Sequence, residues 1–215
     1  MVKRVDPLPV SDDQVRQLLD RYSCPVPFHE VRTRFLGNIA TPHLVSPISL
    51  VQGLWGGELP TFDSTEEANE LIGALIMGLW NRLTRHQDRS APFRLVRIET
   101  KPTRQDLSAL AVIRRQELDG FVEGLFGGEE MVDLPERAHR ALEHLAQIRA
   151  VCVGLIDLTA DETKVGSDTE MEKTVRLMRE ATRQAEHEMH AVVLACKRAR
   201  KEMLMSPAAR KPTFH

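Results

Sequence analysis

Residues 169–205 read TEMEKTVRLMREATRQAEHEMHAVVLACKRARKEMLM, and this stretch contains neither glycine nor proline. Because those two residues interrupt helices most strongly, the stretch predicts one long uninterrupted helix. Apolar or small residues recur along it in alternating steps of four and three, the spacing that keeps one helix face against a partner. This apolar seam consists of Met171, Val175, Met178, Thr182, Ala185, Met189, Val192, Cys196, Ala199 and Met203.

A helix of this length is expected to extend past a compact bundle. At 1.5 Å per residue it reaches about 55 Å, whereas a compact globule of about 150 residues is about 40 Å across. We therefore expect the helix to mediate self-association, with Met178, Met189 and Val192 as contact residues. The alternative is that an elongated bundle covers the seam within the same chain.

Helix start signals recur upstream of the long helix. Ser11 to Gln14 and Ser64 to Glu67 have the pattern of capping boxes, and Ser46 before Pro47 resembles an N-cap with proline at the first helical position. The sequence predicts an all-α fold, an irregular bundle of about six to seven helices with a long C-terminal helix. We expect a flexible N-terminus at 1–10, the helical bundle at 11–158, an acidic linker at 159–168, the long helix at 169–205 and a flexible tail at 206–215.

Two segments inside the bundle raise separate questions. Residues 71–83 are the densest apolar run and are apolar around most of the helix, which predicts a central position. Residues 93–98 fit either a short edge strand or an irregular connector. Pro92 and Pro102 bracket them, which favours the connector.

Composition excludes several classes of protein. The chain has 215 residues and a net charge of −2, from 29 basic and 31 acidic residues, so bulk attraction to nucleic acid or to anionic membranes is not expected. No stretch approaches the run of about 20 apolar residues that a membrane span needs. Cys24, Cys152 and Cys196 form neither a disulfide framework nor a zinc pattern, and Cys152 and Cys196 are expected to be buried. A reducing, cytoplasmic setting follows.

Several motifs of glycines and aromatic residues resemble those of a known family. They are FLGNI at 35–39 followed by TPH at 41–43, Ser46-Pro47, LWG at 54–56, LWNRL at 79–83 and DGFVEGL at 119–125. Together they resemble the YecA/YgfB-like proteins, uncharacterised all-helical bacterial proteins, over most of residues 27–200. The resemblance implies no established reaction. Some members of the family end in a cysteine-rich zinc motif, which this chain lacks because no cysteine follows Cys196.

The cluster Glu186-His187-Glu188-Met189-His190 has the most suggestive chemistry in the sequence. Glu186, His187 and His190 lie three or four residues apart, so pairs of them share a helix face and could ligate a metal. A metal site needs at least three protein ligands, and further ligands such as Glu143 and His144 would have to come from another helix. We therefore expect a solvated helix face and no metal or other cofactor. A metal-dependent protein or enzyme using this face remains the alternative.

Two basic segments suggest another alternative, contact with phosphate groups of nucleic acid. The first contains Arg82, Arg85, Arg89, Arg94, Arg97, Lys101 and Arg104, and the second Lys197, Arg198, Arg200, Lys201, Arg210 and Lys211. Few aromatic residues for base stacking accompany the first segment, and the whole chain is slightly acidic. We therefore expect both basic segments to be solvated faces of the protein. A nucleic-acid-associated regulatory protein that uses these segments remains the alternative.

No nucleophile motif or nucleotide-binding loop is present, so we expect a protein that is not an enzyme. The sequence favours a non-enzymatic interaction or adaptor protein that forms a homodimer and has a protein partner. Trp55 is expected to be either a core residue or, if exposed, an anchor for that partner.

Overall fold

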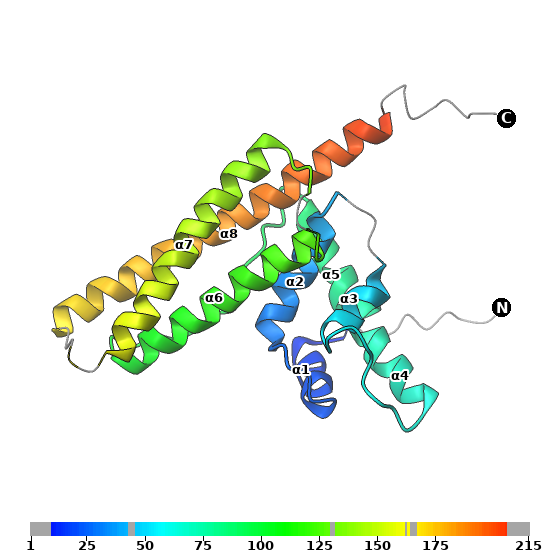
Figure 1. Cartoon of the computed structure of the whole chain (residues 1–215), viewed down its shortest axis with the longest axis horizontal. Coiled ribbons are helices and arrows are strands. Elements are labelled where there is room, and N and C mark those ends of the chain that lie inside the picture. The colour runs from blue at the N-terminus through cyan, green and yellow to red at the C-terminus, as the bar shows by residue number, and fades with distance from the viewer. Residues whose placement is uncertain (1–9, 43–45, 130–131, 162, 164–166, 206–215) are drawn as a thin grey trace.

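The computed structural model describes residues 10–42, 46–129, 132–161, 163 and 167–205. Regular secondary structure among these residues is entirely helical, which confirms the predicted fold class. The elements are α1 (Asp12–Arg21), α2 (Phe28–Ala40), α3 (Pro47–Gly53), α4 (Thr65–Ile72), the π-helix η1 (Gly73–Trp80), α5 (Asn81–Leu83), the 3-10 helix η2 (Thr84–Gln87), α6 (Arg104–Phe126), α7 (Glu136–Ala160) and α8 (Asp168–Met205). In Figure 1, α6, α7 and α8 run side by side, and the shorter helices gather beside α2.

The contact between α2 and α6 is the centre of the fold. Three glycines let the two helices approach closely: a Cβ on Gly124 would lie 1.8 Å from the carbonyl oxygen of Arg34, and one on Gly37 would lie 2.1 Å from that of Phe121. At Gly120, a Cβ would likewise approach the α2 backbone to 2.8 Å. A glycine inside a helix costs about 1 kcal/mol relative to alanine, and at Gly120 the close packing of α6 against α2 explains its presence.

The apolar helix at 71–83 lies at the periphery, so its predicted central position was wrong. Its buried side chains are those of Leu71, Ala74, Leu75, Leu79 and Leu83, whereas Met77 is 70% exposed. The helix contacts α1, α2 and α3, and these neighbours leave the apolar Met77 side chain uncovered. The central position belongs to α2, in which every residue from Thr33 to Ala40 is buried.

Residues 93–98 form an extended connector without a strand partner among the described residues. Side chains of two helices take the place of that partner. The Leu95 amide donates to Glu186 of α8 at 3.0 Å, and the Val96 amide donates to Glu117 of α6 at 2.9 Å. Because buried amides need acceptors, these carboxylates hold the connector between α6 and α8.

The apolar seam of α8 faces the chain's own helices. Met178, Met189 and Val192 are each at most 1% exposed, so they are core residues and do not form the contact surface that we expected. The reason is the length of the neighbours: α6 and α7 have 23 and 25 residues, hence about 35 and 38 Å, and they cover most of α8. Near the end of α8, Met203 and Met205 are more than half exposed.

The buried apolar side chains form two hydrophobic clusters. The larger contains Phe35, Phe121 and Met189, and the smaller contains Leu110, Leu155 and Met178. α8 contributes side chains to both clusters, so it belongs to the bundle and is not an appendage to it.

The connection between α7 and α8 is shorter than the expected linker. α7 continues to Ala160 and α8 begins at Asp168, so both ends of the segment 159–168 are helical. Residues 162 and 164–166 lie outside the described residues, as do the expected flexible ends apart from Val10. Among the helices described, none is both long enough and apolar enough to cross a bilayer.

Burial controls the reactivity of the thiols. Cys152 and Cys196 are fully buried and unpaired, as predicted, and burial raises the pKa of each to about 11. Because the thiolate is the reactive form, we expect a maleimide to label Cys24, which is only partly buried, well before the other two in the native protein. Mass spectrometry of labelled peptides measures this order. Equal native labelling of all three would show that these helix faces are wrongly assigned.

Candidate interaction groove

The side chains of the histidine cluster point to different partners. The Glu186 carboxylate accepts from Arg94 at 2.6 Å, His190 lies 3.2 Å from the carbonyl oxygen of Asp88, and His187 is exposed. Within the described ranges, no three histidine, cysteine or acidic side chains converge in a way that could hold a metal. The three candidate ligands Glu186, His187 and His190 therefore do not form one site in this structure.

Glu188, which the sequence did not single out as a ligand, is the more deeply buried of the two carboxylates in this cluster. It pairs with His144 of α7 at 3.0 Å and with Arg137 at 3.0 Å. Burial tends to raise the pKa of Glu188, but the hydrogen bonds from His144 and Arg137 outweigh it and the pKa is lowered. This cluster joins α7 to α8, which is a structural role.

Trp55 is partly buried and packs beside the C-terminal end of α1. Its indole nitrogen donates to the carbonyl oxygen of Tyr22 at 2.9 Å, and its ring packs against the larger hydrophobic cluster. Trp55 therefore lies at the edge of the core in this structure.

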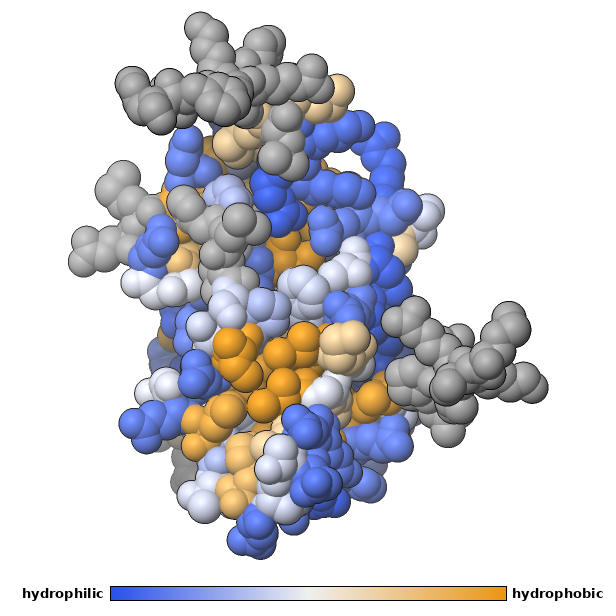
Figure 2. Space-filling model, turned by 90° about the vertical axis from the view of Figure 1, so that its right-hand side faces the viewer, coloured by the Kyte–Doolittle hydropathy of each residue, from blue (hydrophilic) through white to orange (hydrophobic). Residues whose placement is uncertain are grey.

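An apolar groove lies between α1 and η1, on a face that the sequence did not identify. Figure 2 shows apolar side chains gathered in the lower half of the side where α4 lies. The groove has a volume of about 760 Å³. The residues that line this α1/η1 groove are Val10, Gln14, Gln17, Leu18, Arg21, Glu70, Gly73, Ala74, Met77, Gly78 and Arg82.

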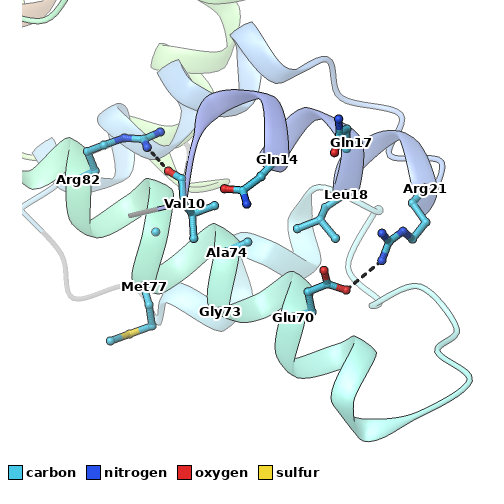
Figure 3. Close-up of a pocket in the computed structure, with 11 residues that line it drawn as sticks. Val10, Gln14, Gln17, Leu18, Arg21, Glu70, Gly73, Ala74, Met77 and Arg82 are labelled. Carbon is cyan, nitrogen blue, oxygen red and sulfur yellow. Dashed lines mark hydrogen bonds and ion pairs between the residues drawn. The ribbon is translucent and has the colours of Figure 1, made fainter. Parts of the chain in front are cut away.

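Small residues of η1 make the floor of the groove hollow. Leu18 of α1 and Ala74 of η1 form apolar walls, and a Cβ added to Gly73 would meet no atom within 4 Å. Met77 stands at the edge and points away from the hollow (Figure 3). π-helices are rare and occur frequently at functional sites, which makes this segment notable.

Charged residues connect α1 to α4 at one end of the groove and to α5 at the other. At one end, Arg21 pairs with Glu70 at 2.9 Å. At the other, Arg82 donates to the carbonyl oxygen of Val10 and pairs with Asp12 (Figure 3 shows the Arg82–Val10 and Arg21–Glu70 contacts). The groove between them is therefore electrically neutral, and its chemistry is that of an apolar binding surface.

One sequence signal could have located the groove. A glycine inside a helix costs about 1 kcal/mol relative to alanine and so marks a special environment. Gly73 and Gly78 both lie inside the most apolar helix, and Gly78 directly follows Met77.

Searches of family models, of curated proteins and of solved structures find no match to this chain.

Proposed function

We propose that this chain is a non-enzymatic interaction protein and that the α1/η1 groove is its contact surface, occupied by a second copy of the chain. The observation that supports this proposal is the juxtaposition of a projecting Met77 side chain with an apolar hollow on the same face. The resemblance to YecA/YgfB-like proteins stays a prediction, and the proposal does not depend on it.

A protruding side chain next to a hollow suits a two-fold dimer. In such a dimer both copies use the same surface, so Met77 of each copy can enter the groove of the other. Methionine is unbranched and polarizable, which lets it fill an irregular apolar space. The ion pairs at the ends of the groove are satisfied within the chain, so the surface does not select a charged partner. The cores of homodimer interfaces are apolar in the same way.

Replacing Met77 with glutamate is expected to dissociate the dimer. The carboxylate would be buried in an apolar hollow without a partner, and the dissociation constant should rise at least about tenfold, equivalent to about 1.4 kcal/mol. Sedimentation velocity over about 1–100 µM covers the range in which such a dimer dissociates. Leu177→Glu is the matched control, because Leu177 is also exposed, at 57%, but lies on α8.

A larger side chain at Gly73, which lines the α1/η1 groove, gives an independent test of the dimer. Gly73 has φ −61° and no neighbour near its Cβ position, so Gly73→Leu should fold normally and still weaken the dimer. Gly154→Leu on α7, where a Cβ also meets nothing within 4 Å, should leave the dimer unchanged. A wild-type protein that stays monomeric throughout this range would refute the second copy as occupant and leave the groove for a helix of another protein.

A further inference from the structure

Arg89 of the first basic segment and Arg198 of the second lie beside the same hollow at the C-terminal half of α8. The turn after η2 packs on this helix: Lys197 donates to the carbonyl oxygen of Gln87 at 2.9 Å, and His190 approaches that of Asp88. This packing brings Arg89 of the first segment and Arg198 of the second to the wall of one hollow of about 410 Å³. The hollow shares no residue with the α1/η1 groove.

The arginines of this hollow are poorly compensated. Arg89 and Arg198 are exposed, and neither forms a hydrogen bond or ion pair with any residue that the structure describes. A third lining arginine, Arg137, pairs with Glu188 at 3.0 Å. Glu202 is the one carboxylate among the lining residues, so cations are in excess around the hollow.

We propose that this hollow binds the phosphate group of a small phosphate ester. Guanidinium groups bind phosphate oxygens through paired, charge-assisted hydrogen bonds, and the two unpaired arginines that line this hollow supply two such groups. Alanines of α8, including Ala191 and Ala195, form another part of the wall and leave room for the body of the ester. The volume lies within the usual range of small-molecule sites.

A small ester fits better than a nucleic-acid backbone. Nucleic-acid binding rests on many phosphate contacts along an extended basic surface. Here other arginines of the first segment are engaged elsewhere: Arg82 with Asp12, Arg94 with Glu186, and Arg104 with the carbonyl oxygen of Thr159. The net charge of the whole chain is −2.

Isothermal titration at low ionic strength with pyrophosphate, adenosine monophosphate and adenosine tests the site on the full chain. We expect the two phosphate compounds to bind and adenosine not to bind. Arg89→Ala and Arg198→Ala should each weaken binding at least about fivefold, because each removes a charge-assisted contact. Glu202→Gln should tighten binding, since it removes the opposing charge.

Arg97→Ala and Arg179→Ala are the matched controls. Both side chains are exposed, neither lines the hollow, and each substitution removes one positive charge. Equal weakening by all four arginine variants would overturn the proposal, because it would reflect net charge alone. Absence of binding by pyrophosphate and by adenosine monophosphate would also overturn it. If duplex DNA binds and neither small compound does, the proposal of a small phosphate ester is wrong. The arginines of the hollow would then contact a nucleic-acid backbone.

Discussion

Gly124→Ala is expected to destabilise the protein by about 3 kcal/mol or more, the upper part of the range for overpacking substitutions. The added methyl group would lie 1.8 Å from the carbonyl oxygen of Arg34, and the neighbouring atoms are also backbone. A flexible side chain could move aside, but a backbone carbonyl moves only with its helix, so α2 and α6 must separate. For a chain of this size, 3 kcal/mol lowers the melting temperature by about 6–12 °C. Thermal unfolding followed by circular dichroism measures the loss.

The control for this substitution is Gly154→Ala on α7. A Cβ at Gly154 meets no atom within 4 Å. Because alanine is the better helix former, this variant should gain up to about 1 kcal/mol. A Gly124→Ala protein that melts at the wild-type temperature would mean that α2 and α6 do not approach as closely as described.

The second large effect is expected at Arg114, whose guanidinium pairs with Glu117 one turn along α6 and donates to the carbonyl oxygen of Val96 at 2.7 Å. The side chains of Arg114 and Glu117 are 7% and 0% exposed. Arg114→Met leaves the carboxylate buried without its counter-charge, which costs about 3–5 kcal/mol in comparable buried pairs. Urea unfolding measures this loss. Arg183→Met, which removes an exposed pair of the same spacing with Glu180, should cost about 1 kcal/mol or less.

The pH dependence of stability shows whether Arg114→Met destabilises the protein by removing the counter-charge of Glu117 or by removing packing contacts. Burial already raises the pKa of Glu117 above its ordinary 4.5, although Arg114 and the Val96 amide oppose the rise. Removing Arg114 raises it further. A carboxyl group whose pKa is higher in the folded state takes up a proton on folding. The loss of folding stability that it causes is therefore absent below the pKa of the unfolded state and grows as pH rises above that value. The stability gap between Arg114→Met and wild type should therefore narrow as pH falls, whereas a packing defect would leave it constant.

Local signals in the sequence were sufficient for much of the fold. Ser11 caps α1 and bonds reciprocally with Gln14, as the capping-box pattern predicted. This prediction succeeded because a cap depends only on residues within the first turn of its helix.

Long-range arrangement was less accessible. Periodicity showed that Met178 and Met189 share a face with Val192, but it did not show what covers that face, which depends on the lengths and directions of α6 and α7. Similarly, apolarity alone could not tell a central helix from a peripheral one with an uncovered side. The α1/η1 groove combines residues about 60 positions apart, such as Leu18 and Met77, and no local pattern connects them.

The position of α8 in the chain has a consequence for synthesis. α8 supplies side chains to both hydrophobic clusters, yet it is the last of the described helices to leave the ribosome. Until its residues 175–196 emerge, the apolar faces of α6 and α7 that they cover are open to solvent. At about 5–20 residues per second, that interval lasts for seconds on a nascent chain. During it, the exposed faces are the surface that a chaperone would bind and through which unfinished chains would aggregate.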